Sequence, residues 1–200
     1  MLPGPSLVES ARRTTAPSSA ADEVRLLDRI AARDRKAFEE LYRLYHPRLT
    51  RFLGTMLRHP HLVEEALNDC LMVVWKRPEK FNGTSKVSTW IFGIAYRIAL
   101  KARSRYDEPV EDQIDPPTAD GEIDPEQSLG QRQVQAVLLG AMGQLSAEHR
   151  AVVDLTYFHD AGYREIAEIL DCPVGTVKTR MHHARRRLKD LLAGRLMDWL

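Results

Sequence analysis

The sequence contains few of the residues that mark several protein classes. Its two cysteines, Cys70 and Cys172, are far apart and have no Cys-x-x-Cys spacing, so neither a disulfide nor a zinc site is expected. Aromatic residues make up only 7% of the 200 residues, and strand-like alternation of apolar residues is absent. No apolar run is long enough for a transmembrane helix or a signal peptide. We therefore expect an all-α protein of the cytoplasm.

Motifs for catalysis and for cofactors are also missing. His149 and His159 are separated in the sequence, and neither belongs to a Cys, His and acid pattern typical of a hydrolase. Gly83, Gly93 and Gly175 belong to no loop of the kind that cradles phosphates. We expect a protein that is not an enzyme and that carries no cofactor and no metal.

The formal net charge is only +1, but this balance hides a strong segregation of charge. Between Asp107 and Glu126 the chain has nine acids, four prolines and no Lys or Arg, a composition that favours an extended linker over a packed element. We expect this flexible acidic linker, at residues 106–130, to join two small helical domains at 22–105 and 131–200. The first residues, 1–21, are rich in Ala, Ser, Thr and Pro and are predicted to be a disordered extension.

The segment from Tyr163 to Leu192 reads YREIAEILDCPVGTVKTRMHHARRRLKDLL. A short apolar-periodic helix, a tight turn at residues 171–173 and a second, basic helix make the pattern of a helix-turn-helix. The second helix of such a motif can enter the major groove of DNA. Asp171 stands where glycine is more usual in the turn, and aspartate tolerates the left-handed backbone better than most residues.

The second helix has one apolar stripe and one basic, polar face. The stripe repeats at i, i+4, i+7 and i+11 and consists of Val177, Met181, Ala184 and Leu188. From Lys178 to Arg195 the helix carries seven Lys or Arg and one acid, a charge pattern that favours binding to a polyanion. An ordinary helical hairpin with a solvated basic face is the alternative.

The helices predicted before the linker offer two further candidate surfaces. The first of them spans about residues 37–57, with Pro47 expected to kink or divide it and Tyr42 expected to face the core. The next, near residues 63–76, presents a mostly acidic face that suits either protein docking or plain solvation. That face consists of Glu65, Asn68, Asp69 and Met72.

A small polar loop and a basic helix follow. The residues Asn82, Gly83, Thr84, Ser85 and Lys86 form the loop, and a helix capped by Ser88 or Thr89 continues to about Ser104. A loop of this kind beside an aromatic, basic helix can hold unstacked bases while the helix follows the phosphates. The helix residues assigned to this role are Trp90, Arg97 and Lys101, although Trp90 could instead be a core residue.

The order of these segments resembles a bacterial RNA polymerase sigma factor of the extracytoplasmic-function (ECF) group of the sigma-70 family. The resemblance rests on the acidic-faced helix ending VVWK, the segment STWIFGIAYRIA, the acidic linker and the terminal helix-turn-helix, and it covers about residues 22–192. It implies a chain that joins core RNA polymerase and directs transcription initiation at promoter DNA. It also implies regulation by an anti-sigma factor and no insertion into a membrane.

The resemblance further implies a role for each candidate surface. The face with Glu65, Asn68, Asp69 and Met72 would dock on the clamp helices of the largest polymerase subunit. The loop 82–86 would capture a flipped base of the −10 element, beside a helix that contacts the same element. In the helix-turn-helix, the residues implied to contact the −35 element are Thr176, Lys178, Thr179, Arg180, His183 and Arg186. A stand-alone helix-turn-helix transcriptional regulator is the alternative, and it would need only the second domain.

Overall fold

The computed structural model describes residues 19–105 and 137–196, with side chains as far as residue 193. Every regular element in these two ranges is helical, as expected. No helix within them is both long and apolar enough to cross a membrane. The expected acidic linker and nearly all of the expected N-terminal extension lie outside the described residues. The named elements are α1 (Ala20–Ala31), α2 (Arg35–Met56), α3 (Pro60–Lys76), the 3-10 turn η1 (Pro78–Lys80), α4 (Val87–Arg105), α6 (Ala147–Tyr157), α7 (Tyr163–Ile169) and α8 (Val174–Leu196).

Local side-chain caps account for several of the helix starts. Ser19 and Asp22 form a capping box, so α1 begins at Ala20, slightly before the expected domain boundary. Asp34 accepts hydrogen bonds from two amides of the first turn of α2, at 2.9 and 3.3 Å. Pro60 occupies the first turn of α3, where its missing N–H costs little. Ser146 caps α6 by accepting from the His149 amide.

Of the two effects expected of Pro47, a kink or a division, the division does not occur, because the long helix α2 continues from Arg35 to Met56. Its buried residues hold it against the neighbouring helices over its whole length. The expectation that Tyr42 faces the core was wrong, since the side chain is 36% exposed. Its position lies at the margin of the stripe formed by Leu41, Tyr45 and Leu49, all fully buried.

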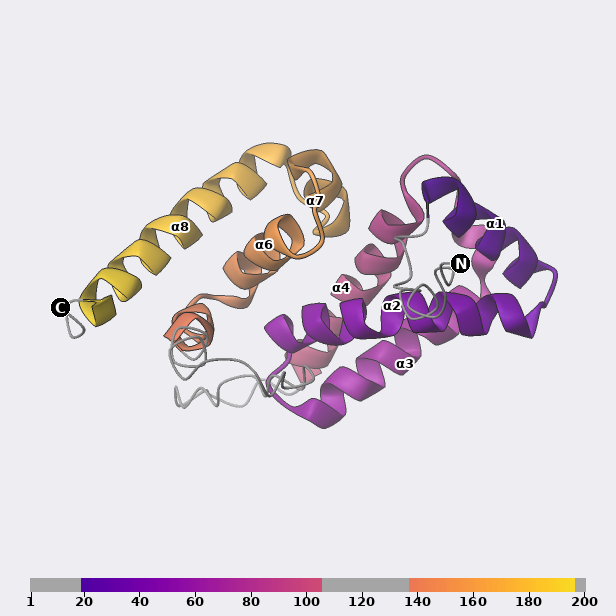
Figure 1. Cartoon of the computed structure of the whole chain (residues 1–200), viewed down its shortest axis with the longest axis horizontal. Coiled ribbons are helices and arrows are strands. Elements are labelled where there is room, and N and C mark those ends of the chain that lie inside the picture. Colours follow the sequence, from indigo (N-terminus) through magenta and orange to yellow (C-terminus); the bar gives the residue numbers. More distant parts are fainter. Residues whose placement is uncertain (1–18, 106–136, 197–200) are drawn as a thin grey trace, which may run out of the picture.

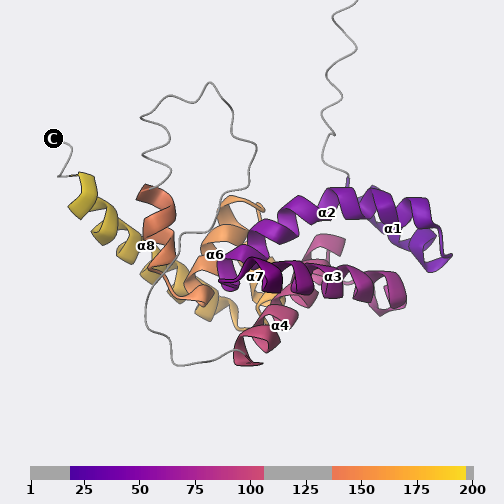
Figure 2. The ribbon, with the colours of Figure 1, turned by 90° about the horizontal axis from the view of Figure 1, so that it is seen from below.

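The chain forms two helical bundles that pack against each other (Figures 1 and 2). The N-terminal bundle consists of α1 to α4, and the C-terminal bundle consists of a helical stretch at 137–143 and of α6 to α8. In the contacts between the bundles, α2 packs on α6 and α4 packs on α7. The buried side chains of both bundles form one continuous hydrophobic cluster. The two expected domains are therefore closed against each other.

Candidate nucleic-acid interface

The helix-turn-helix has the geometry that the sequence predicts. α7 ends at Ile169, and the chain turns into α8 through Asp171, which has the left-handed φ of 48°. The Cys172 amide donates to the Ala167 carbonyl at 3.0 Å and so closes the turn. A left-handed residue at this point is what reverses the chain tightly enough for the two helices to pack.

The apolar stripe and the basic face of α8 also lie where they were expected. Val177, Met181 and Ala184 are buried against α6 and α7, and Leu188 is half-buried. The opposite face is exposed and carries Lys178, Thr179, His182, His183 and Arg186. Guanidinium, ammonium and imidazole groups on one exposed helix face suit contact with phosphates and base edges.

Two of the residues implied to contact the −35 element are less accessible. Thr176 and Arg180 are half-buried, and Arg180 lies beside Cys172, with Nη1 3.9 Å from Sγ. Burial raises the pKa of the Tyr96 phenol on α4, and the positive charge of Arg180 partly offsets this rise. Arg180 therefore lies close enough to the N-terminal bundle to act on Tyr96. Its role in DNA contact stays a prediction.

His183, which follows His182 on α8, also has a neighbouring ring. The ring of His183 lies 6.4 Å from that of His149 on α6. Burial lowers the pKa of His149, and the charges of His183 and Arg180 lower it further. His183 is the more exposed of the two rings, and its contact with DNA stays a prediction.

The loop 82–86 is shaped by its own side chains. Asn82 Oδ1 accepts from the Thr84 amide at 3.0 Å and from the Thr84 hydroxyl at 2.7 Å, which makes an Asx turn. Gly83 has a φ of 73°, a conformation that favours glycine. Asn82, Gly83 and Thr84 are exposed, whereas Ser85 is half-buried. The loop therefore presents small polar groups on a preformed turn.

The helix after this loop begins beside an aromatic pair. Trp90 is half-buried and packs on Phe81, with ring centroids 5.6 Å apart, so it is neither fully in the core nor freely exposed. Arg97 and Lys101 are exposed one turn apart on α4 and keep the basic stripe that the sequence predicts. Such a stripe can follow a phosphate backbone.

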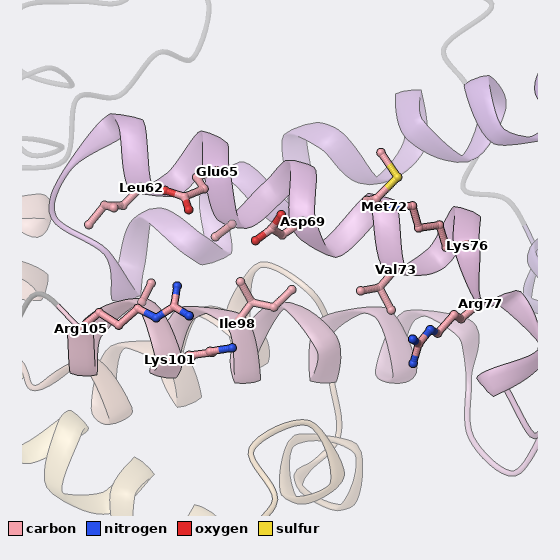
Figure 3. Close-up of a pocket in the computed structure, with 12 residues that line it drawn as sticks. Leu62, Glu65, Asp69, Met72, Val73, Lys76, Arg77, Ile98, Lys101 and Arg105 are labelled. Atoms are coloured by element: carbon pink, nitrogen blue, oxygen red, sulfur yellow. The ribbon is translucent and has the colours of Figure 1, made fainter.

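The acidic face of α3 is exposed and borders a groove between α3 and α4. Glu65, Asn68, Asp69 and Met72 are all exposed, and the Met72 side chain is 47% accessible. The groove has a volume of about 730 Å³. Figure 3 shows carboxylates from α3 on one side of it and cationic side chains from α4 on the other. It brings part of the docking face together with Lys101, a residue predicted to contact DNA.

Three residues that join the two bundles were not identified from the sequence. Arg51 Nε donates to Asp154 Oδ1 at 2.9 Å, and Asp154 Oδ2 lies 3.0 Å from Nε2 of His159. Asp154 is only 1% exposed. Its position in the apolar run AVVDLTYF was a signal, because a buried carboxylate needs a partner, but the sequence does not identify that partner.

Comparison with known proteins identifies the family. The family model for Sigma-70 region 2 matches residues 41–108, and the model for Sigma-70 region 4 matches residues 135–188. The ECF RNA polymerase sigma factor RpoE of Cereibacter sphaeroides is 33% identical over 161 residues, a match that covers 79% of this chain and 87% of the relative. The chain belongs to the ECF sigma factors of the sigma-70 family. The ECF sigma factor SigW of Bacillus subtilis is 27% identical over 174 residues, or 80% of this chain and 90% of the relative.

Solved structures support the fold of this sigma factor. The sigma factor RpoE of Bartonella quintana, in a co-crystal structure with the anti-sigma factor NepR, matches with a TM-score of 0.59 and 26% identity. That match covers 79% of this chain and 98% of the other. CnrH, in a complex with the cytosolic domain of CnrY, has a TM-score of 0.63 at 20% identity and supports the fold alone; it covers 87% of this chain and 98% of that one. The family consists of transcription initiation factors.

Proposed function

We propose that this sigma factor binds core RNA polymerase and directs initiation at promoters with both a −35 and a −10 element. The observation that supports this proposal is that one chain has two separate surfaces with the chemistry suited to nucleic acid. The exposed basic face of α8 lies in the C-terminal bundle, and the loop 82–86 with the stripe of α4 lies in the N-terminal bundle. A stand-alone regulator needs only the first of these.

The −35 element is assigned to α8. The exposed Lys178, Thr179, His183 and Arg186 share the face opposite the packed stripe, so they can reach DNA without repacking of the motif. Arg186 can read a guanine through two hydrogen bonds, an interaction that discriminates by about 1–3 kcal/mol. Thr176 and Arg180 would contribute after the bundles separate.

The −10 element is assigned to the loop 82–86 and to α4. The Asx turn at Asn82 holds the loop open, and a base that leaves the stack could hydrogen-bond to its small polar groups. Arg97 and Lys101 would hold the adjoining phosphates. Because the chain carries no nucleotide-binding motif, strand opening would draw on binding energy, and base capture offsets an unstacking cost of a few kcal/mol.

The polymerase docking site is assigned to the exposed face of α3. Met72 projects from an otherwise polar surface, with Asp69 and Lys76 on the same groove (Figure 3). A flexible apolar side chain in this setting suits a partner that offers an apolar pocket with a charged rim. By the resemblance, that partner is the clamp-helix region of the largest polymerase subunit. An anti-sigma factor, such as the NepR found with the Bartonella relative, would act by covering this face.

Run-off transcription with purified core polymerase tests the proposal. The chain should yield specific transcripts from a subset of promoters. Met72→Asp should weaken the binding of core polymerase about tenfold or more. Arg186→Ala should reduce transcription about tenfold, and only on templates that depend on a −35 element. Arg164→Ala is the matched control, because Arg164 is an exposed arginine on α7, outside the proposed recognition face.

Two results would argue for other functions. Tight operator binding by the chain alone, with no transcripts on any promoter, would support the stand-alone regulator. An equal loss for Arg186→Ala on templates with and without the −35 element would remove the assignment of α8.

A further inference from the structure

Gly175 lies in the first turn of α8, and nothing in the described part of the chain requires a glycine there. Its φ is not positive, unlike that of Gly83, so other residues can adopt the same backbone. Apart from the adjoining residues and the backbone of its own helix, a Cβ built on Gly175 would have no heavy atom within 4 Å. By contrast, a Cβ on Gly93 would lie 3.9 Å from the Ile169 carbonyl oxygen. Neither backbone conformation nor packing therefore explains the glycine at position 175.

The glycine also weakens the helix in which it lies. Glycine is the least favourable helix residue after proline, because its backbone loses the most freedom on folding. Alanine at position 175 would therefore strengthen the start of α8, and it would fit without any rearrangement of the free chain. The stability of the free chain gives no reason for the missing side chain, whereas a partner that needs the space does give one.

Gly175 belongs to the line of residues that faces furthest from the packed side of α8. Each residue of this line comes two positions before a member of the apolar stripe, which is about 200° around the helix. All four residues are exposed, and we call them the outer ridge: Gly175, Thr179, His182 and Arg186. Figure 1 shows α8 starting beside α7 and running along the outside of the C-terminal bundle. A partner that binds this side of α8 therefore meets the outer ridge first.

The outer ridge is low at its start and high further along. Gly175 has no side chain, and the Thr179 hydroxyl turns back along the helix to donate to the Gly175 carbonyl at 3.0 Å. His182 and Arg186 carry large polar side chains that remain exposed. The start of the ridge therefore lets a partner come close to the helix backbone, and its later part offers an imidazole and a guanidinium.

The charge around Gly175 favours a partner that carries phosphates. From Val174 to Lys189, α8 has six Lys or Arg and no Asp or Glu. The start of an α-helix also carries the positive end of the helix dipole. In helix-turn-helix proteins the first residues of the second helix are those that reach the base edges of duplex DNA. Duplex DNA thus fits both the charge and the position of Gly175.

The major groove leaves little room for an extra side chain on the helix that enters it. The groove is about 12 Å wide, and an α-helix with its side chains is about 10–12 Å across. A Cβ stands about 1.5 Å out from its Cα. Hydrogen bonds to base edges need donor–acceptor distances of about 2.7–3.2 Å, so a displacement of that size breaks them.

We propose that Gly175 is a close-approach position, at which the bare backbone of α8 packs directly against the wall of the major groove at the −35 element. The missing Cβ sets how deeply α8 enters the groove, and this depth brings Arg186 and its neighbours within hydrogen-bonding distance of the bases. Gly175 is thus a positioning residue for recognition of the −35 element. The inference rests on the proposed assignment of α8 to that element.

The test compares Gly175→Ala with Gly54→Ala in the full chain. Gly54 lies within α2, and a Cβ there would likewise have no heavy atom within 4 Å outside its own stretch of helix. Both changes should raise the urea midpoint of the free chain, because alanine is the better helix former. In complex with core polymerase, Gly175→Ala should weaken binding to a −35-dependent promoter about tenfold or more. Gly54→Ala should change this binding by less than about twofold.

A second variant, Gly175→Leu, tests whether the loss grows with the size of the side chain. Leucine is also a better helix former than glycine, so the urea midpoint should again not fall. Binding to the same promoter should nevertheless be weaker than for Gly175→Ala. On a template whose −35 element is replaced by unrelated sequence, both variants should bind as the wild type does.

Several results would overturn the inference. A lower urea midpoint for Gly175→Ala would mean that folding itself requires the glycine. Equal losses on templates with and without the −35 element would mean that the effect lies elsewhere. If the wild type depends on the −35 element but both Gly175 variants bind like it, the close approach is refuted and the proposed function stands. A wild-type holoenzyme that depends on no −35 element at any promoter would overturn the proposed function and this inference with it.

Discussion

Arg150 offers a sharp test of how the C-terminal bundle is held together. Its guanidinium donates to the carbonyls of Gly143 at 3.0 Å and Leu145 at 2.7 Å, near the end of the helical stretch 137–143, and to the Thr55 carbonyl of α2 at 2.6 Å. One side chain thus binds the C-terminal ends of two helices and links the two bundles. A cation at the C-terminal ends of helices also interacts favourably with their dipoles.

Arg150→Met keeps most of the side-chain volume but removes all three hydrogen bonds. Bonds to a charged group contribute about 1.5–3 kcal/mol each. Two effects reduce this sum. The carbonyl of the half-buried Thr55 can regain a hydrogen bond to water, and burial together with the charges of Arg58 and Arg103 lowers the pKa of Arg150. We therefore expect the free energy of unfolding to fall by about 3 kcal/mol, or about 100-fold in the equilibrium constant.

Urea denaturation followed by circular dichroism measures this loss. Arg150→Lys keeps the charge but not the planar fork, so it should lie between the wild type and Arg150→Met. Arg164→Met, at an exposed position on α7, should change stability by less than about 0.5 kcal/mol. The reasoning is refuted if Arg150→Met unfolds within about 0.5 kcal/mol of the wild type.

Three further predictions concern the turn, the core and the dependence on pH. Asp171→Gly should stabilise the chain by about 0.5 kcal/mol and Asp171→Ala should destabilise it by about 1 kcal/mol, because only glycine adopts a φ of 48° freely; equal urea midpoints would contradict this. Phe92→Ala removes a ring that is 1% exposed and should lower the free energy of unfolding by about 3–5 kcal/mol in a denaturation experiment. A loss below about 1 kcal/mol would mean that the core around Phe92 is not tightly packed. The pKa of Glu165 in the folded chain is lowered from its ordinary value of 4.5. Its contribution to the free energy of unfolding is therefore complete above pH 4.5 and is lost as the pH falls through the lowered pKa. Glu165→Gln should flatten the fall in stability between about pH 6 and about pH 3, and a parallel curve for variant and wild type would refute the pairing with Lys86.

The helices and the helix-turn-helix could be predicted because local chemistry determines them. The period of Val177, Met181 and Ala184 identifies the buried side of α8 whatever it packs against, and it also predicts which residues remain exposed. The left-handed turn at Asp171 follows from short-range backbone preferences. The same periodicity misplaced Tyr42. A residue at the margin of an apolar stripe is buried or exposed according to which other helices pack beside it.

The sequence by itself determined an all-α chain with two basic surfaces, an acidic-faced helix and the membership of the sigma-70 family that these motifs indicate. Only the tertiary structure decided that the two bundles close on each other through Arg51, Asp154 and His159, and that Lys86 pairs with Glu165 across the same contact. The physical reason is sequence separation. Asp154 lies 103 residues from its partner Arg51, and no local pattern encodes which distant cation will meet a buried carboxylate.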